Sequence, residues 1–326
     1  MRIAHVATSY PRDPDDPTGH FVRAEALADA LENNEVHIVA PAPFARDVGV
    51  EAHALGGAAL FSWPGAVARG RALPSRWLHA PVALARGARA LAELEPDVIV
   101  AHWALPCAWP MSAGRRAELR VVSHGGDVRL LVGLPSPARD ALVGWLAARA
   151  AEWRFVARSL LGALLDVSPP SLRTDVERIA SVRPPRVDVS EAGAPPGHGH
   201  AVVVGRLVRS KRIDLAIDAA TRARVPLVVI GDGPEEGALR RRAAGADVRF
   251  TGRLGRRDTL SWLRGARALL HPSELDAAPT AVLEARALSV PVIAADVGDV
   301  AWWATRDDGI TVTRRDARSL ADALAR

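Results

Sequence analysis

Two carboxylates interrupt a run of small and apolar residues near the C-terminal end of the sequence. Asp276 and Glu284 lie eight positions apart in ELDAAPTAVLEARALSVPVIA, residues 274–294. The pattern predicts that Asp276 lies in a turn and Glu284 in the helix that follows, about one turn beyond its start. A helix N-terminus keeps nearby carboxylates ionised. Glu274, at the start of the run, is expected to be a loop residue in solvent.

A pair of cations forms a second candidate site. Arg206 and Lys211 lie five positions apart in VVVGRLVRSKRID, where a strand-like run ends at Gly205 and a helix follows. Arginine and lysine beside a helix N-terminus can neutralise a diphosphate. Lys211 is the only lysine among 42 lysine and arginine residues, which favours a function over the alternative of solvated surface cations.

The elements that must position these residues alternate between strand-like and helical patterns. Continuous apolar runs predict strands covered on both faces, and the intervening segments repeat apolar residues at helical spacing. The alternation predicts parallel α/β sheets. In the first half the expected strands are 2–8, 35–41, 97–103, 119–125 and 152–158, with helices at 20–34 and 81–94. In the second half they are 201–206, 226–231, 248–252, 268–273 and 291–296, with helices at 212–223, 235–245, 257–266 and 280–288.

The chain is therefore expected to form two doubly wound, Rossmann-like domains. Residues 1–184 form the first, 185–200 form a linker rich in Pro, Gly and Ser, and 201–326 form the second. Ligands of open α/β sheets bind at the carboxyl ends of the strands, so we expect a site in a central cleft between the two domains.

Composition and motifs exclude several classes of function. No apolar run reaches the length of a membrane span, and no signal-peptide core follows Met1, so a cytoplasmic protein is expected. Cys107 is the only cysteine, which excludes internal disulfides and cysteine-based zinc sites. The net charge of +5 is interspersed with acidic residues, so nucleic acid is not an expected partner. GDGPEEG at 231–237 lacks the later acidic residue of a dinucleotide site and predicts a glycine turn.

Four segments of the second half resemble retaining glycosyltransferases of family 4, which have the GT-B fold. These are VVVGRLVRSKRIDLAIDA, VIGDGPEEGAL, VRFTGRL and LLHPSELDAAPTAVLEARALSVPVIAADVGDV, in the family's order and spacing. Asp276 to Glu284 matches the family's E-x7-E signature with Asp in the first place. The chain departs from the pattern where AAP replaces GFG, and the second domain is expected to be shortened at its C-terminus.

The resemblance implies a role for each matching residue of the second half. Asp276 orients the donor sugar, and Glu284 accepts hydrogen bonds from the ribose hydroxyls. The residues that hold the donor diphosphate and the nucleobase are then Arg206, Lys211 and Gly205, the backbone amides of Thr280, Ala281 and Val282, and the turn that follows Gly252, with Arg253 and Leu254.

In the first half the resemblance rests on PTGHFVRAEALADAL and VVSHGGDV. It implies that Gly19 lets the backbone approach the donor diphosphate and that His124 lies beside the reacting sugar. The expected residues of the acceptor side are His102, Trp103 and Asp127, and the aromatic residues that could stack on a sugar ring are Tyr10, Phe21 and Trp103.

The implied activity is transfer of a sugar, with retention, from a nucleoside-diphosphate sugar to a hydroxyl of a glycan, lipid-linked or small-molecule acceptor. UDP is the expected nucleotide, with GDP as the alternative, and neither a metal nor a cofactor is expected. A sugar-nucleotide epimerase and a non-catalytic nucleotide-sugar-binding protein are the alternative functions. Residues 141–165 leave open a peripheral contact with a membrane surface, against the interpretation of an ordinary helix and strand.

Overall fold

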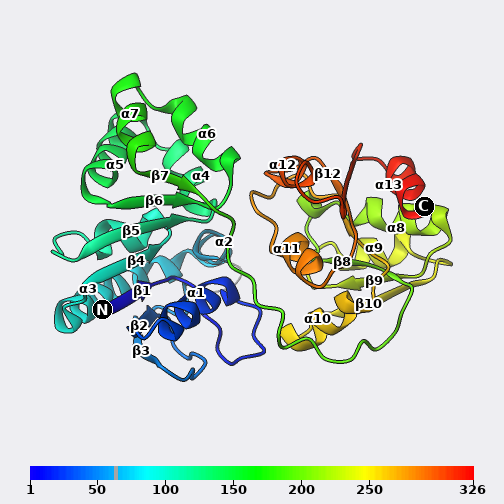
Figure 1. Ribbon diagram of the computed structural model, residues 1–326, viewed down its shortest axis with the longest axis horizontal. Helices are drawn as coiled ribbons and strands as arrows, with labels where there is room; N and C mark the ends of the chain where they lie inside the picture. Colours follow the sequence, from blue (N-terminus) through cyan, green and yellow to red (C-terminus); the bar gives the residue numbers. More distant parts are fainter. Residues whose placement is uncertain (62–64) are drawn as a thin grey trace. The chain divides into compact units, whose positions relative to one another are not determined.

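The computed structural model describes residues 1–61 and 65–326 and divides the chain into two compact units, Met1–Arg186 and Val187–Arg326 (Figure 1). Residues 183–200 form no helix or strand. The later part of this segment packs on the second unit, where the Gly193 amide donates to Ser261 Oγ at 2.9 Å. Most of the stretch predicted to be a linker is therefore a fixed part of the second unit.

The first unit is built on one parallel sheet. Among residues 1–61 and 65–186 its strand order is β3-β2-β1-β4-β5-β6-β7. The strands are β1 (Arg2–Val6), β2 (Glu35–Ala40), β3 (Val50–Ala54), β4 (Val98–His102), β5 (Glu118–Ser123), β6 (Glu152–Phe155) and β7 (Ala180–Val182). The helices are α1 (His20–Leu31), α2 (Ala66–Ala72), α3 (Ala80–Leu94), α4 (Gly126–Val132), α5 (Ser136–Arg149), α6 (Arg158–Val167) and α7 (Pro170–Ile179), with short helical turns at Pro74–His79 and Ala104–Met111.

The second unit repeats this arrangement. Its parallel sheet has the order β10-β9-β8-β11-β12-β13. The strands are β8 (Ala201–Val204), β9 (Leu227–Ile230), β10 (Val248–Gly252), β11 (Ala268–His271), β12 (Val292–Ala295) and β13 (Ile310–Thr313). The helices are α8 (Ile213–Ala223), α9 (Glu236–Arg242), α10 (Arg256–Arg264), α11 (Thr280–Ala287), α12 (Val300–Ala304) and α13 (Ala317–Leu324), with a short helical turn at Arg209–Lys211.

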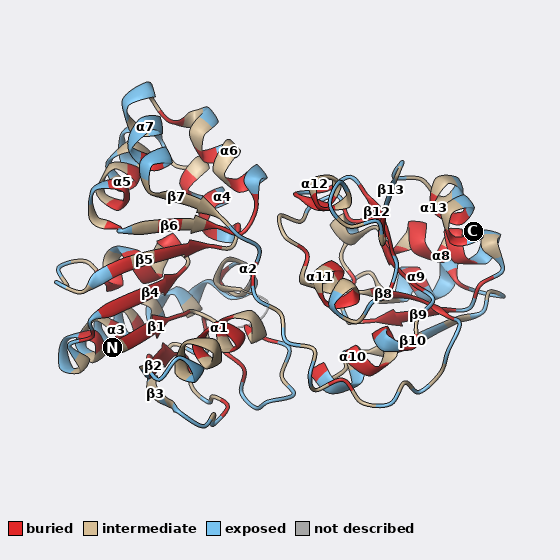
Figure 2. Cartoon of the chain, viewed as in Figure 1, coloured by how far each residue is buried: buried red, intermediate tan, exposed pale blue. Residues whose placement is uncertain are grey.

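Successive residues of the central strands pack into separate apolar layers. Val203 of β8 belongs to the layer that α8 and α13 cover, with Ile217 and Leu320. Its neighbour Val202 belongs to the layer that contains Val282 of α11. Side chains alternate between the faces of a strand, so both faces of this sheet are covered by helices. Figure 2 shows the inner strands as buried. The prediction of two doubly wound α/β domains is confirmed.

The segment 141–165 folds into the end of α5, β6 and the start of α6. Trp153 and Phe155 of β6 are fully buried, and Trp153 Nε1 donates to Ser123 Oγ at 3.0 Å. These aromatic residues are core residues, which favours the ordinary helix-and-strand interpretation over a lipid contact. No helix in the described part of the chain combines the length and apolarity that crossing a bilayer requires.

Gly231 and Gly233 of GDGPEEG are required by backbone packing. A Cβ at Gly231 would lie 1.9 Å from the Gly205 carbonyl oxygen, and one at Gly233 would lie 2.4 Å from the Leu207 carbonyl oxygen. The turn therefore holds the loop after β9 against the loop after β8. This packing explains the motif without a dinucleotide.

We expect Gly231→Ala to lower the free energy of unfolding by about 2–4 kcal/mol, because the new Cβ meets backbone and φ is +139°. Gly237→Ala is the matched control in α9, where a Cβ meets only the flexible end of Arg241 at 3.7 Å, and should change stability by about 1 kcal/mol or less. Urea unfolding of both variants measures the difference. Equal stabilities would contradict the packing argument.

Candidate functional site

The order of strands indicates where a ligand would meet each unit. Strand order reverses between β1 and β4 in the first sheet and between β8 and β11 in the second. In doubly wound sheets, ligands bind at the carboxyl ends of the strands at this switch point. Arg206 lies two residues after the end of β8, and Asp276 lies in the loop that follows β11. The switch point of the second sheet thus carries the residues singled out in the sequence.

The structure brings Lys211 and Asp276 together. Lys211 ends the short turn before α8, and its Nζ donates to both carboxylate oxygens of Asp276 at 2.7 Å. Both side chains are 18% exposed, so ligand can reach them. His271 Nε2 at the end of β11 lies 3.1 Å from Asp276 Oδ2. One carboxylate therefore faces two nitrogen-bearing side chains at the switch point.

The surroundings of Asp276 hold it ionised. Burial alone would raise the pKa of its carboxyl, but the contact with His271 and the charge of Lys211 outweigh burial and hold the pKa well below its usual range. Asp276 is therefore an acceptor, and not an acid, at neutral pH. Such a carboxylate can bind hydroxyl groups but cannot protonate a leaving group.

Glu284 forms a second, more deeply buried ion pair. It lies in α11, and its Oε1 accepts from Arg256 Nη1 of α10 at 2.7 Å, with each side chain 7% exposed. Arg256 also donates to the Asp188 carbonyl oxygen. Burial raises the pKa of Glu284, and the charge of Arg256 opposes that rise. Sequence reasoning missed Arg256, because nothing distinguishes it from the neighbouring arginines Arg253 and Arg257.

The first turn of α11 changes the prediction that the amide of Val282 contacts phosphate. The helix begins at Thr280 after Pro279, and no side chain caps it. The amide of Val282 donates to the Pro279 carbonyl oxygen at 3.1 Å, so this amide is already used within the turn, and its side chain is buried. The amides of Thr280 and Ala281 lie earlier in the helix, where amides have no partner within the helix. Contact of these two amides with phosphate stays a prediction.

The other predicted residues of the second unit lie in the loops at the same end of the sheet. Gly205 donates its amide to the Ile230 carbonyl oxygen at 3.0 Å, and Arg206 beside it is partly exposed. Arg253, after β10, is exposed, whereas Leu254 packs against the apolar layer that includes Val282.

Glu274 lies at the start of the loop that carries Asp276. It is exposed, as expected, and its Oε1 accepts from Arg212 Nη1 at 2.7 Å. Its carboxylate is therefore part of a surface ion pair.

The first unit contains a chain of histidines that ends at His124. His5 Nε2 lies 2.9 Å from Asp29 Oδ2, and His5 Nδ1 lies 3.1 Å from His102 Nε2. His102 Nδ1 then lies 3.2 Å from His124 Nε2. Adjacent rings stack, with centroids 5.4 Å apart in both pairs. The rings come from β1, the end of β4 and the residue after β5, so the sheet itself aligns them.

The carboxylate of Asp29 fixes the direction of this chain when the rings are neutral. An ionised carboxylate only accepts, so His5 Nε2 donates to it and His5 Nδ1 accepts from His102. His102 in turn accepts from His124 Nε2. Burial is the main cause that lowers the pKa of both rings. The pKa of His102 lies well below its usual range, and the pKa of His124 is lowered to about 3. His124 is thereby left with Nδ1 as a hydrogen-bond acceptor.

Two of the predicted aromatic residues surround His124. Its ring centroid lies 4.6 Å from that of Phe21 and 4.9 Å from that of Trp103. All three side chains are partly exposed. Their apolar rings and the acceptor nitrogen could together contact a sugar, which presents both C–H faces and hydroxyl groups.

Three predicted lining residues are corrected by burial. His102 is 0% exposed, so it reaches a ligand only through His124. Asp127 is 1% exposed, and its carboxylate accepts from the amides of Ala104 at 2.8 Å and Gly125 at 3.1 Å, which holds the turn beside His124. Tyr10 is 2% exposed, and its hydroxyl donates to Asp47 Oδ2 at 2.9 Å, so it cannot stack on a sugar.

Gly19 precedes α1 with φ of +68°. A Cβ there would lie 2.5 Å from the Ser9 carbonyl oxygen. This close approach of two backbone segments requires glycine whether or not a ligand binds. The predicted contact between Gly19 and a diphosphate stays a prediction.

With this geometry established, comparison with known proteins places the second unit in a family. A family model described as glycosyl transferases group 1 matches residues 199–326. Residues 199–326 form a glycosyl transferases group 1 domain. The match contains the Lys211–Asp276 and Arg256–Glu284 pairs, and so both charged pairs of the candidate site lie in this domain.

Similar proteins extend the likeness over more of the chain. TuaC of Bacillus subtilis, named as a teichuronic acid biosynthesis glycosyltransferase, is 28% identical over 246 residues, which is 72% of this chain and 62% of TuaC. The chain thus spans less than two thirds of that relative. Sucrose-phosphate synthase from Thermosynechococcus elongatus superposes with a TM-score of 0.69 at 17% identity, over 99% of this chain and 88% of its own. HepE of Anabaena, in complex with UDP, superposes with a TM-score of 0.67 at 16% identity, over 99% of this chain and 89% of its own. The chain has the GT-B fold.

We expect His124 to stay neutral, with its proton on Nε2, from about pH 8 down to about pH 4, because its pKa is about 3. The unfolded chain binds this proton at the usual pKa of 6.5, so His124 contributes to a loss of stability as the pH falls below about 6.5. Nitrogen-15 NMR of the ring reports the tautomer and its titration.

The matched variant is Asp29→Asn, whose side-chain amide can donate or accept and no longer fixes the direction of the chain. Both tautomers of His124 should then be populated. A wild-type His124 with its proton on Nδ1 would contradict the proposed direction.

Proposed function

We propose that this protein is a retaining glycosyltransferase of family 4 that transfers a sugar from a nucleoside-diphosphate sugar to an acceptor hydroxyl. One observation carries the proposal: the Lys211–Asp276 pair lies at the switch point of a glycosyl transferases group 1 domain. A nucleoside-diphosphate sugar presents negative phosphate oxygens, which a cation can bind, and sugar hydroxyls, from which an ionised carboxylate can accept hydrogen bonds.

Lys211 and Arg206 act on the diphosphate. As the glycosidic bond breaks, negative charge accumulates on the departing nucleoside diphosphate, and preorganised cations stabilise that charge. The amides of Thr280 and Ala281 at the start of α11 supply further donors. This set of positive groups replaces a metal ion, so we propose that transfer is metal-independent.

The two carboxylates take different hydroxyls. Asp276, held ionised, accepts from the transferred sugar, whose position changes as the bond breaks. Glu284 accepts from the ribose hydroxyls while Arg256 holds its carboxylate in place. In the first unit, His124 Nδ1 offers an acceptor for a hydroxyl, and the rings of Phe21 and Trp103 offer a contact for the apolar face of a sugar. That His124 lies beside the reacting sugar stays a prediction.

Retention of the anomeric configuration follows because the acceptor attacks the same face of the sugar from which the leaving group departs. The acceptor oxygen forms a bond to the anomeric carbon while the bond to the diphosphate oxygen breaks. The acceptor proton passes to a diphosphate oxygen, so no enzymic base or nucleophile is required. Asp276 stabilises the intermediate charge on the sugar without forming a bond to it.

The proposed nucleotide is UDP and the proposed process is polysaccharide biosynthesis. The solved structure of HepE contains UDP, and the name of TuaC refers to teichuronic acid. The acceptor is a hydroxyl-bearing glycan, lipid-linked or small molecule. A cytoplasmic location and a peripheral contact with a membrane surface stay predictions.

Thermal shift with UDP, GDP and their sugars tests the donor, and we expect UDP and a UDP-sugar to stabilise the protein most. Incubation with the preferred donor should release UDP in excess EDTA, and NMR of the product should show a retained anomeric configuration. An epimerised donor, or tight binding without UDP release on any acceptor, would overturn the proposal. Preference for GDP would correct only the base.

We expect Lys211→Met to reduce kcat/KM by about 10- to 150-fold, because one charge-assisted contact contributes about 1.5–3 kcal/mol. Arg209→Ala, which removes an exposed cation two positions away, is the control and should leave the rate near that of the parent. Comparable rates in the two variants would remove the argument for Lys211.

We expect Asp276→Asn to lower kcat about 10-fold or more and to leave UDP affinity within about threefold, since its contacts change in the transition state. Glu284→Gln should weaken UDP and donor about equally. Gln is chosen because Glu284→Ala would leave the buried Arg256 unpaired, at a cost of about 3–5 kcal/mol. Calorimetry with UDP decides the assignment, and the reverse pattern would show that the two roles are exchanged.

A further inference from the structure

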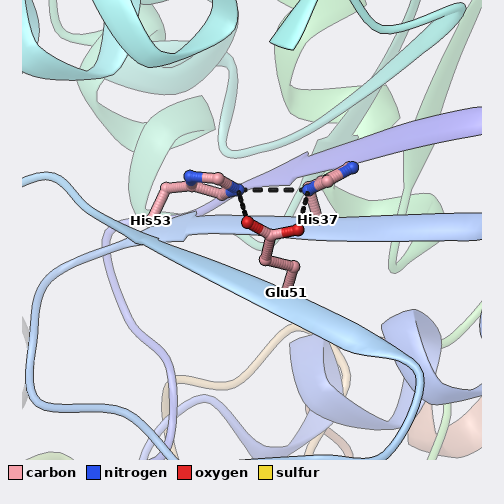
Figure 3. A group of neighbouring side chains, drawn as sticks. All are labelled: His37, Glu51 and His53. Atoms are coloured by element: carbon pink, nitrogen blue, oxygen red, sulfur yellow. Dashed lines mark hydrogen bonds and ion pairs between the residues drawn. The ribbon is translucent and has the colours of Figure 1, made fainter.

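A second cluster of chemically competent side chains lies on β2 and β3 of the first unit. His37 Nδ1 is 3.1 Å from His53 Nε2 and 3.7 Å from Glu51 Oε2, and His53 Nε2 is 3.8 Å from Glu51 Oε1. Figure 3 shows the two rings and the carboxylate pointing toward one another. Three possible metal ligands thus converge from two adjacent strands.

The strand register explains why they converge. β2 and β3 are parallel, with His37 opposite Glu51 and Val39 opposite His53. Residues two apart on a strand share a face, so Glu51 and His53 lie on the same side of β3. The sheet therefore sets the spacing of the ligand atoms, and only side-chain rotation is needed to adjust it.

We propose that His37, Glu51 and His53 bind a zinc ion. Bonds of about 2.0–2.2 Å in a tetrahedral site place ligand atoms about 3.3–3.5 Å apart. The two imidazole nitrogens are 3.1 Å apart, and each lies 3.7 or 3.8 Å from a different carboxylate oxygen of Glu51, so a small rotation of this carboxylate brings one oxygen into the required range. Two imidazole nitrogens and one carboxylate oxygen are a zinc donor set, and water completes the coordination.

A second carboxylate supports this donor set. His37 Nε2 lies 3.1 Å from Glu35 Oε1, and Glu35 is itself held by Arg2 Nε at 3.0 Å. Donation from Nε2 to Glu35 leaves Nδ1 of the ring with its lone pair directed at the cluster. Histidines that bind metals are commonly oriented by a carboxylate in this way.

The cluster is accessible and lies apart from His124 in the first sheet. The side chain of His37 is 4% exposed, whereas those of His53 and Glu51 are 25% and 69% exposed, so an ion can enter from solvent. Strands β2, β1 and β4 separate β3 from β5, after which His124 follows. β3 is the edge strand, so the ion would tie that edge to β2 and would take no part in transfer.

Calorimetric titration of the full, tag-free chain with zinc chloride tests the proposal. We expect one site that weakens about 100-fold or more in His53→Ala and Glu51→Gln, because each loses a ligand. Glu35→Gln should weaken it by about 10- to 100-fold by releasing the His37 ring. His198→Ala, which removes an exposed histidine outside this cluster, is the matched control and should bind as the parent does.

Cobalt(II) gives a second readout, since a tetrahedral site with two imidazoles absorbs visible light. Glu51→Gln alters an exposed side chain and keeps the test valid if His53→Ala fails to fold. Zinc should raise the Tm of the parent and not of Glu51→Gln. Equal zinc affinity in the parent and both ligand variants would overturn the proposal and identify the His37–His53 contact as a simple hydrogen bond. The sugar-transfer rate stays unchanged in these variants, so the two proposals fail independently.

Discussion

Burial of the parallel strands on both faces is the constraint on which the rest of the structure depends. Strands such as β8 have apolar partners on both faces, so their side chains leave little surface for contact with a ligand. The polar side chains of the candidate transferase site are then found mainly in the residues that follow each strand. This is why His124 in the first unit, and Arg206 and Asp276 in the second, all lie just after a strand. Within the second sheet, strand order places β8 beside β11 and so brings the loops of Arg206 and Asp276 to the same switch point.

Charges at such positions need partners before any ligand arrives. In the free protein these charges form internal ion pairs. The Lys211–Asp276 pair is shallow, with both side chains partly exposed, and the Arg256–Glu284 pair is deep, with both side chains buried. The shallow pair can exchange partners with a ligand at modest cost because both side chains remain in contact with solvent. The deep pair is better suited to hold a fixed carboxylate, since separating it would leave a charge in a nearly dry environment. Different depths of burial thus separate an exchangeable pair from a fixed one.

The sequence predicted the alternation of strands and helices well, because continuous apolar runs such as 98–102 leave few alternatives. Short or exposed elements were missed: β3 carries Glu51 and His53 in place of a buried run, and β13 lies near the chain end with little apolar pattern. The predictions that failed concern burial. His102, Asp127 and Tyr10 are of residue types that line sites, and only the packing of neighbouring elements shows that they are enclosed. Arg256 was hidden for the opposite reason, among many arginines of equal appearance.

The direction of the hydrogen bonds also makes the row of stacked histidines one-way for protons. Asp29, at the outer end, is 31% exposed at its side chain, whereas His102 in the middle is sealed from water. Each of the three rings carries its proton on the nitrogen that faces outward, toward Asp29, and has its lone pair on the nitrogen that faces inward. No ring therefore has a free outward nitrogen that could receive a proton from the Asp29 end. The row thus shields the lone pair of His124 Nδ1 from protons that arrive at Asp29, and this nitrogen stays an acceptor.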